Sequence, residues 1–178
     1  MKTNIPSASK DCWYAAKTKG ISGRKIREIL DNLNVESFMP MYEAETERYG
    51  MKVKIFKPLV LNLIFIHADY TTAQALIQEH ELPLTYMDDP HSDGLLTVPD
   101  KRIQDLRLVM SQTNDFLHLS NDTVRRGDLV KVNEGEFTGI EGELVRIKGH
   151  KRVVIRLEGL FSLATTYIPG SYLEKIEE

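Results

Sequence analysis

The stretch EGEFTGIEGELVRI, residues 134–147, places Gly135, Gly139 and Gly142 among acidic and branched apolar residues. Glycine has no Cβ, so it adopts the positive φ angles of turns and tolerates the bulges at strand corners. Short alternating strands include and flank this stretch, and glycine-containing turns separate them. The predicted strands cover residues 129–132, 143–147, 152–157 and 163–168. Even spacing with almost no helix is typical of a small closed barrel, which we predict for residues 124–178.

The N-terminal part instead alternates strands and helices. An aromatic-rich strand is predicted at residues 13–18, followed by a helix whose apolar residues are spaced i, i+3, i+4, i+7. These residues are Ile26, Ile29, Leu30 and Leu33. Ser22 is the predicted N-cap. Arg24 and Lys25 fall in the first turn, where cations oppose the helix dipole, and such a departure from local rules can indicate a functional surface.

Two predicted strands flank Tyr49-Gly50, and one carries glutamates at 43, 45 and 47 where the other carries Lys52 and Lys54. We expect acid and base to pair across this ribbon. Residues 59–66 then read as a strand that is apolar on both faces. Such a strand is either covered on both sides or leaves one face for a partner. We expect the face of Leu63 and Phe65 to be open, the alternative being that both residues are core.

A short helix after residue 70, capped by Thr71 and Thr72, and a helix from Asp100 complete the N-terminal part. The mixture of elements favours an α+β fold, an antiparallel α/β sandwich with helices on one face of its sheet. The polar residues 111–123 suggest a linker. We therefore predict an N-terminal domain over 1–113, a linker over 114–123 and the barrel over 124–178.

Charge is unevenly distributed along the 178 residues, whose net charge is −3. Residues 1–57 carry +4, residues 58–123 carry −7 and residues 124–178 are neutral. This balance excludes a uniformly basic nucleic-acid-binding protein, and the basic N-terminal third is either a docking surface or a solvated face. The single Cys12 excludes an internal disulfide. Without an apolar stretch of membrane length or a signal core, we expect a cytoplasmic protein with no membrane contact.

Four motifs carry a resemblance to a known family. Residues 127–159, GDLVKVNEGEFTGIEGELVRIKGHKRVVIRLEG, closely resemble the KOW motif, and residues 12–40, CWYAAKTKGISGRKIREILDNLNVESFMP, are similar to the opening of the NusG family of transcription elongation factors. KPLVLNLIFIHAD at 57–69 and VPDKRIQDLR at 98–107 match later family elements. The resemblance implies an N-terminal NGN domain followed by an SH3-like KOW barrel, and a transcription elongation or antitermination regulator without catalytic activity.

The resemblance also implies sites. The N-terminal domain would bind the clamp helices of RNA polymerase and hold the clamp against the opposite lobe, with Lys17, Pro40, Leu63 and Phe65 in the contact. Relatives of a specialised kind, which antiterminate long operons such as those for surface polysaccharide, touch the non-template DNA strand at positions matching Lys17, Lys19, Arg24 and Lys25. Solvated surface cations are the alternative for these four residues.

For the barrel, the resemblance implies contact with a ribosomal protein or a termination factor through Phe137, Ile140, Leu160 and Phe161. Alternatively, Phe137 folds inward and caps the barrel. Leu163 stands where many relatives have arginine, and Val60-Leu61-Asn62-Leu63 replaces the usual Phe-Pro-x-Tyr. We expect a monomer with no cofactor or metal.

Two other classes of function compete with this one. An enzyme would need Cys12 with His67 or His118 as nucleophile and base, but no flanking signature supports it. The pairs His67-x-Asp69 and His91-x-Asp93 lack a third metal ligand. A KOW-containing RNA- or ribosome-binding module is the other alternative, although the barrel segment is neutral and lacks interleaved aromatic and basic residues.

Overall fold

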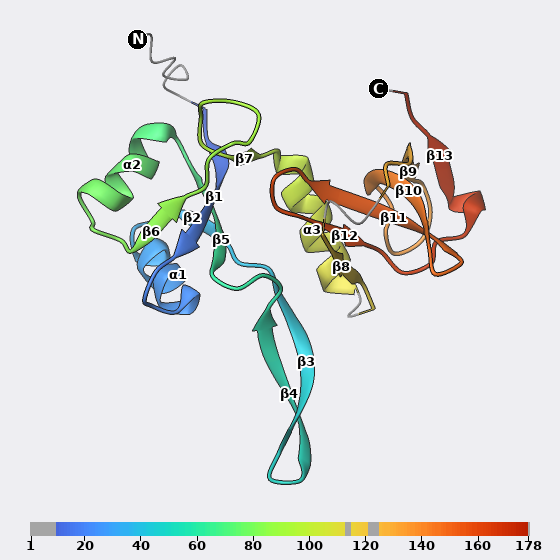
Figure 1. The fold of residues 1–178 in the computed structure, drawn as a ribbon, viewed down its shortest axis with the longest axis horizontal. Coiled ribbons are helices and arrows are strands. Elements are labelled where there is room, and N and C mark those ends of the chain that lie inside the picture. Colours follow the sequence, from blue (N-terminus) through green and yellow to red (C-terminus); the bar gives the residue numbers. More distant parts are fainter. Residues whose placement is uncertain (1–9, 113–114, 121–124, 178) are drawn as a thin grey trace. The chain divides into compact units, whose positions relative to one another are not determined.

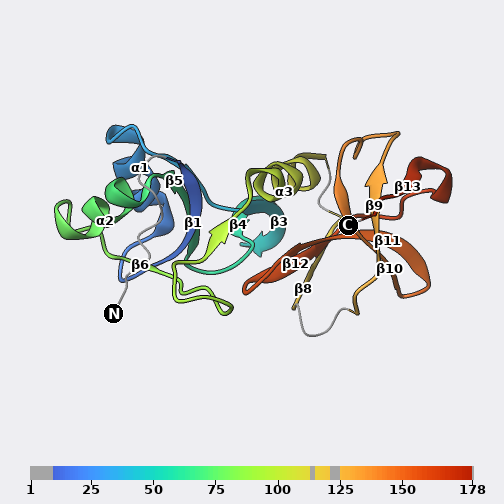
Figure 2. The ribbon, with the colours of Figure 1, turned by 90° about the horizontal axis from the view of Figure 1, so that it is seen from above.

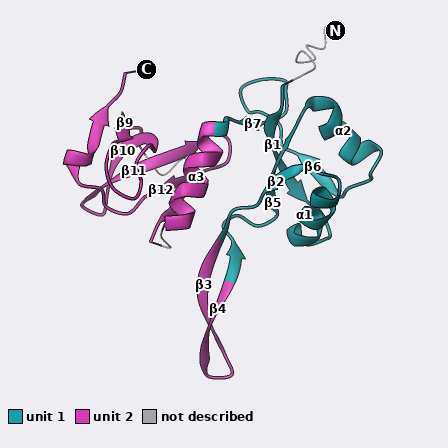
Figure 3. Ribbon diagram, turned by 180° about the vertical axis from the view of Figure 1, so that it is seen from behind, with its two compact units in different colours: residues 1–41, 56–100 teal, residues 42–55, 101–178 magenta. Residues whose placement is uncertain are grey.

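The computed structural model describes residues 10–112, 115–120 and 125–177. The chain divides into two compact units, shown in Figure 3: residues 1–41 with 56–100, and residues 42–55 with 101–178. No helix in the described ranges is long and apolar enough to cross a membrane. The units are described one at a time.

The first unit is built on an antiparallel sheet in the order β2-β5-β1-β6, and β7 also pairs with β1. Its elements, labelled in Figure 1, are β1 (Cys12–Thr18), α1 (Gly23–Asn32), β2 (Glu36–Phe38), β5 (Leu63–Ala68), α2 (Tyr70–Gln78), β6 (Leu84–Tyr86) and β7 (Thr97–Val98). Helices α1 and α2 lie on the same side of this sheet in both Figure 1 and Figure 2.

One face of the sheet forms a core with these two helices. Ile64 and Ile66 of β5 pack there with Ile26 and Leu30 of α1 and Leu76 of α2, all buried. The helix starts are fixed locally. The Ser22 side chain accepts a hydrogen bond from Lys25 N at 3.4 Å, which confirms the predicted cap.

The predicted cap of α2 is wrong. Asp69, rather than Thr71 or Thr72, caps the helix, because its Oδ1 accepts from Thr72 N at 2.8 Å. The Thr72 hydroxyl also donates to Asp69 Oδ2, at 3.1 Å. The hydrogen bonds that the Thr72 backbone N–H and hydroxyl donate to the carboxylate lower the pKa of Asp69. The carboxylate also lies at the end of the helix where a negative charge is favourable.

The second face of the sheet is covered, which corrects the expectation of an open ladder. Leu63 and Phe65 are 2% and 0% exposed. The β1–β5 register places Ala15 opposite Phe65 on this face. The Phe38 ring of β2 stacks on Phe65, with ring centroids 6.2 Å apart. Moreover, β5 begins only at Leu63, because residues 59–62 form a turn rather than strand.

Strands β3 (Met41–Arg48) and β4 (Met51–Pro58) form a separate two-stranded ribbon. Tyr49 and Gly50 at its tip have φ angles of 53° and 76°, the signature of a type I′ hairpin turn. The predicted acid–base pairing is confirmed by ion pairs between Lys54 and Glu43 at 2.7 Å and between Lys52 and Glu45 at 3.8 Å.

The second unit contains a six-stranded antiparallel sheet in the order β13-β9-β10-β11-β12-β8, which we call the C-terminal sheet. Its elements are α3 (Asp100–Gln112, of which residues 101–112 belong to this unit), β8 (Leu117–Leu119), β9 (Asp128–Val132), β10 (Glu141–Ile147), β11 (His150–Leu157), β12 (Phe161–Ala164), the 3-10 helix η2 (Gly170–Tyr172) and β13 (Leu173–Lys175). Strand β12 ends at Ala164, earlier than predicted. The predicted linker contains β8, which pairs with β12.

The glycines of residues 134–147 serve two purposes. Gly135 has a φ of 84° in the turn after β9, where a side chain would be strained. Gly142 lies inside β10, and a Cβ there would approach the Val154 carbonyl oxygen to 2.5 Å. One glycine therefore allows the turn, while the other allows β11 to lie close to β10.

The predicted α+β class is confirmed, with an N-terminal α/β region and a C-terminal region of antiparallel sheet. The unit boundaries differ from the predicted domains, since residues 101–112 of α3 group with the C-terminal sheet. The predicted linker also lies partly outside the described residues, at 114 and 121–123. The functional domain limits therefore stay a prediction.

Candidate partner-binding surfaces

The turn before β5 brings exposed apolar side chains to one end of the first sheet. Leu61 is 76% exposed and Phe56, at the end of β4, is 66% exposed. The turn is anchored by its backbone: Leu59 N donates to Pro40 O at 2.8 Å, and Thr18 N donates to Asn62 O at 2.9 Å. We call Phe56 and Leu61, with the turn between them, the apolar edge. A fixed backbone holds these side chains in solvent.

The four residues predicted to contact polymerase meet at this end of the sheet, but only one is exposed. Lys17 of β1 is exposed and is paired in register with Leu63. Pro40, Leu63 and Phe65 are buried. The three apolar residues are therefore core, and Lys17 is the one of the four whose side chain reaches solvent. The sequence-based prediction of this site did not include Leu61. Its place in Val60-Leu61-Asn62-Leu63, which differs from the usual Phe-Pro-x-Tyr, could have suggested it.

The corner between β1 and α1 is cationic. Lys17, Lys19, Arg24 and Lys25 are all exposed, and the first turn of α1 has no acidic residue. Arg27 pairs with Asp31 further along α1. By contrast, the four cations have no ion pair within the described part of the chain. We call these four residues the cationic corner. Their charge is available to an external anion.

On the C-terminal sheet, the four predicted contact residues are mostly buried. Ile140 is fully buried, Phe161 is 3% exposed and Phe137 is 7% exposed, while Leu160 is half-buried. Phe161 packs edge-on against His118 of β8, with ring centroids 5.2 Å apart. Phe161 is covered by His118 of β8, and Phe137 is folded inward, which is the alternative given for that residue. The contact of these four residues with a partner stays a prediction. Leu163 is also buried, as a core residue of β12.

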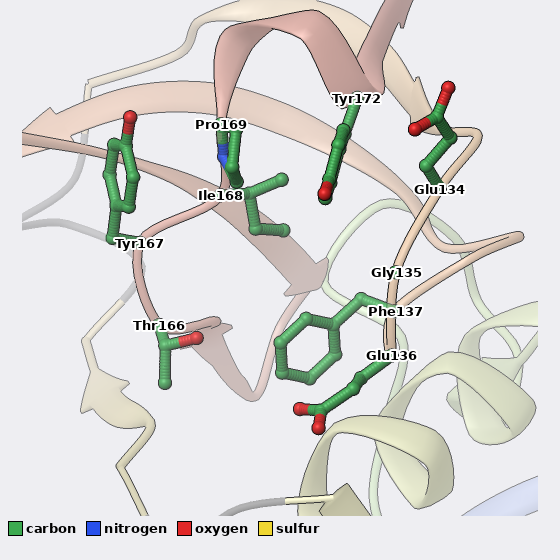
Figure 4. A pocket seen from close by; sticks show the side chains of 9 residues that line it. All are labelled: Glu134, Gly135, Glu136, Phe137, Thr166, Tyr167, Ile168, Pro169 and Tyr172. Atoms are coloured by element: carbon green, nitrogen blue, oxygen red, sulfur yellow. The ribbon is translucent and has the colours of Figure 1, made fainter.

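Phe137 nevertheless lines a hollow that the sequence did not reveal. A cavity of about 230 Å3 lies between the β9–β10 loop and the segment that follows β12. We call it the aromatic pocket. Its lining residues, drawn in Figure 4, are Glu134, Gly135, Glu136, Phe137, Thr166, Tyr167, Ile168, Pro169 and Tyr172. The two walls are distant in sequence, so only the two glutamates next to Phe137 in EGEF could have suggested the site.

Several charged residues of the second unit are engaged internally. Arg156 binds the Glu143 carboxylate with two hydrogen bonds of 2.9 and 3.0 Å. Burial acts to raise the pKa of Glu143, but Arg156, the Gly127 N–H and Arg126 together lower it below its ordinary value. On α3, Arg102 donates to Glu141 O at 2.6 Å. These contacts support the fold, and the Arg156–Glu143 pair is neutralised within the sheet.

Asp105 shows the opposite balance. Its carboxylate pairs with Lys101, which also donates to Gly139 O at 2.8 Å. Burial nevertheless raises the pKa of Asp105, because desolvation outweighs the attraction of Lys101. This cluster joins α3 to the β9–β10 loop within the second unit.

The arrangement of the enzyme candidates does not favour catalysis. The β1–β5 register places Cys12 opposite Ala68 and Trp13 opposite His67, so Cys12 and His67 point to opposite faces of the sheet. His67 instead stacks on Trp13, and its Nδ1 lies 3.4 Å from Glu36 Oε2. His118 packs against Phe161, and burial lowers its pKa.

The two candidate metal-binding pairs are not arranged as a metal site either. Asp69 is engaged in capping α2, and Asp89 accepts from His91 N at 2.9 Å in a local turn. Within residues 10–112, 115–120 and 125–177, no three His, Cys, Asp or Glu residues come together in a way that could hold a metal ion.

Comparison with known proteins gives one family. The family model described as "Transcription termination factor nusG" matches residues 11–107. Among solved structures, the chain is similar to one titled "Domain interaction in Thermotoga maritima NusG", at 15% sequence identity and a TM-score of 0.41, covering 94% of this chain and 98% of that chain. A search of curated proteins finds no match.

Proposed function

Because the chain belongs to the NusG family of transcription termination and elongation factors, whose members are not enzymes, we propose that it bridges two parts of RNA polymerase. Its N-terminal region binds the polymerase clamp helices and holds the clamp toward the opposite lobe. Bridging disfavours the open states that lead to pausing or termination. About 1.4 kcal/mol of preference for the closed state changes the open-to-closed ratio tenfold.

The observation that carries this proposal is the apolar edge beside Lys17. Leu61 and Phe56 remain exposed on an anchored backbone, and burying a few such side chains contributes about 25 cal/mol per Å2 before association costs. Pro40, Leu63 and Phe65 act from below by fixing the turn. A helical partner such as the clamp coiled coil offers an apolar stripe that matches this edge.

The cationic corner extends the same surface toward nucleic acid. Lys17, Lys19, Arg24 and Lys25 bind the phosphates of the exposed non-template strand, since no internal carboxylate competes for them in the described residues. Such a contact suits a specialised paralogue that acts in the cytoplasm on long operons, such as those for surface polysaccharide. The C-terminal sheet recruits a second protein, a ribosomal protein or a termination factor, with Phe137, Ile140, Leu160 and Phe161 forming or supporting the contact.

Co-purification with RNA polymerase tests the bridging proposal. The double variant Phe56→Ser/Leu61→Ser should lose polymerase binding while keeping its fold, because both side chains are exposed. Tyr70→Ser, at the start of α2 and 36% exposed, is the matched control. Equal retention of polymerase by all three proteins would contradict the proposal. If the full chain held RNA but no polymerase, the RNA- or ribosome-binding module would be favoured instead.

A further inference from the structure

The aromatic pocket has preformed walls. Gly135 lies under the Tyr172 ring, and a Cβ on Gly135 would come within 3.2 Å of that ring. Asn133 N donates to Tyr172 O at 2.8 Å, and Tyr172 N donates to Pro169 O at 3.0 Å. Phe137 is 7% exposed, so its ring is a fixed wall. Figure 4 shows the Tyr172 hydroxyl and the Phe137 ring turned toward the hollow.

The carboxylates of the pocket differ from the other acids of the sheet. The other acidic residues between residues 128 and 158 each have a cation partner: Asp128 with Lys175, Glu141 with Lys131, Glu143 with Arg156 and Glu158 with Arg126. Glu134 and Glu136 have no ion pair among the described residues. Both line the aromatic pocket. The pocket therefore combines aromatic faces with uncompensated negative charge.

We propose that the aromatic pocket binds an extended peptide segment that carries arginine or lysine next to proline or another apolar residue. A cation is attracted both by the two carboxylates and by the faces of Tyr167 and Tyr172. The rigid rings and Pro169 form the kind of surface on which an extended, proline-containing backbone packs with little entropy loss. Nucleic acid is disfavoured, because its phosphates would meet Glu134 and Glu136.

This inference rests on the proposed recruitment of a second protein by the C-terminal sheet, and it specifies the chemistry of the segment recognised. It also changes which residues make the contact. Phe137 is shared with the expected site, whereas Tyr167, 57% exposed, and the two glutamates are new. Ile140 and Phe161 support the sheet from within.

NMR titration of the full chain tests the proposal, with an octapeptide of alternating proline and arginine as the probe. We expect the amide signals of Gly135, Phe137 and Thr166 to shift on addition, and the shifts to weaken as salt is raised. The double variant Glu134→Gln/Glu136→Gln should bind about fivefold more weakly, since it removes two ion pairs that are each weak because they are exposed to solvent. Glu28→Gln/Glu79→Gln, with the same change of net charge in the first unit, should bind like the wild type.

Three outcomes would overturn the proposal: equal shifts with an octapeptide of alternating proline and glutamate, shifts confined to residues outside the pocket, or no shift at all. Tyr167→Ala is a second variant that removes a ring without altering charge, and it should also weaken binding. Polymerase co-purification is measured on the same variants. A wild-type chain that retains polymerase but binds no peptide would show a failure of the pocket proposal alone, and one that binds the peptide but no polymerase would show a failure of the bridging proposal alone.

Discussion

Two sets of cations, one in each unit, are used in opposite ways. In the C-terminal sheet, Arg156 is held by Glu143, and Arg152 donates to Thr165 O at 2.7 Å. At the cationic corner, Arg24 and Lys25 are exposed at the start of a helix whose dipole opposes them. A buried arginine with a carboxylate partner supports the fold, whereas exposed cations in an unfavourable position are better explained by an external anion.

Apolar residues show the same contrast within one segment. Phe65 is 0% exposed and stacks on Phe38, while Leu61, four positions earlier, is 76% exposed. The difference shows that consecutive apolar residues need not all belong to the same buried face. Its strand portion forms core, and its turn portion remains available to a partner.

The largest expected effect separates these two portions. Phe65→Ala should lower the free energy of unfolding by about 3–5 kcal/mol, because it leaves a cavity at a fully buried position. Leu61→Ala should change it by less than about 0.5 kcal/mol. Urea unfolding followed by the fluorescence of Trp13, the only tryptophan, measures both. Equal losses would show that Leu61 is also core.

The next effect concerns the buried ion pair. Arg156→Ala should cost about 3 kcal/mol, because it leaves the Glu143 carboxylate, itself 9% exposed, without its main partner. Hydrogen exchange of the β10 and β11 amides reports this loss. The double variant Glu143→Leu/Arg156→Leu should recover most of the stability. If it were as unstable as Arg156→Ala, the lost charge balance would not be the cause.

Acidification should distinguish the two buried carboxylates of this unit. The pKa of Glu143 is lowered in the folded protein, so its contribution is present above 4.5, its ordinary pKa, and is lost as the pH falls through the folded value. The stability difference between wild type and Glu143→Gln should therefore shrink as the pH falls below 4.5 and disappear once the pH is below the folded pKa. For Asp105, whose pKa is raised, protonation on acidification should instead favour the folded state. A loss of stability at Asp105 on acidification, relative to Asp105→Asn, would contradict its assignment.

The smallest effect on stability is expected at the cationic corner. Replacing Lys17, Lys19, Arg24 and Lys25 by glutamine should leave the unfolding midpoint unchanged, because the four side chains are exposed and lack ion pairs in the described structure. For single-stranded DNA, the slope of log affinity against log salt concentration should become less negative by about 3, since each lost phosphate contact contributes about 0.7 to the slope. An unchanged slope would show that these residues are solvated surface.

Local rules predicted part of this structure well. The Ser22 cap depends on a few neighbouring residues, and the ribbon pairing of Glu43 with Lys54 follows from a two-residue turn that fixes the register. Alternation also located β9, β10 and β11 to within two residues.

The contacts that the sequence did not predict are between residues far apart in the chain. Phe65 stacks on Phe38 of the neighbouring strand β2, and the aromatic pocket forms only when Tyr172 packs on Gly135. Neither contact produces a periodic sequence pattern, because both depend on tertiary packing. Asp69 was missed for a different reason, since the neighbouring Thr71 and Thr72 are also favoured capping types.

The ribbon tip has a practical consequence. Tyr49 is fully exposed at the end of two arms joined by ion pairs, while Cys12, the sole cysteine, is partly buried. A fluorophore attached through a thiol at position 49, in a Tyr49→Cys/Cys12→Ser chain, would be tethered to an ordered hairpin rather than a loose loop. Its emission would then report the arrival of any macromolecule at the tip.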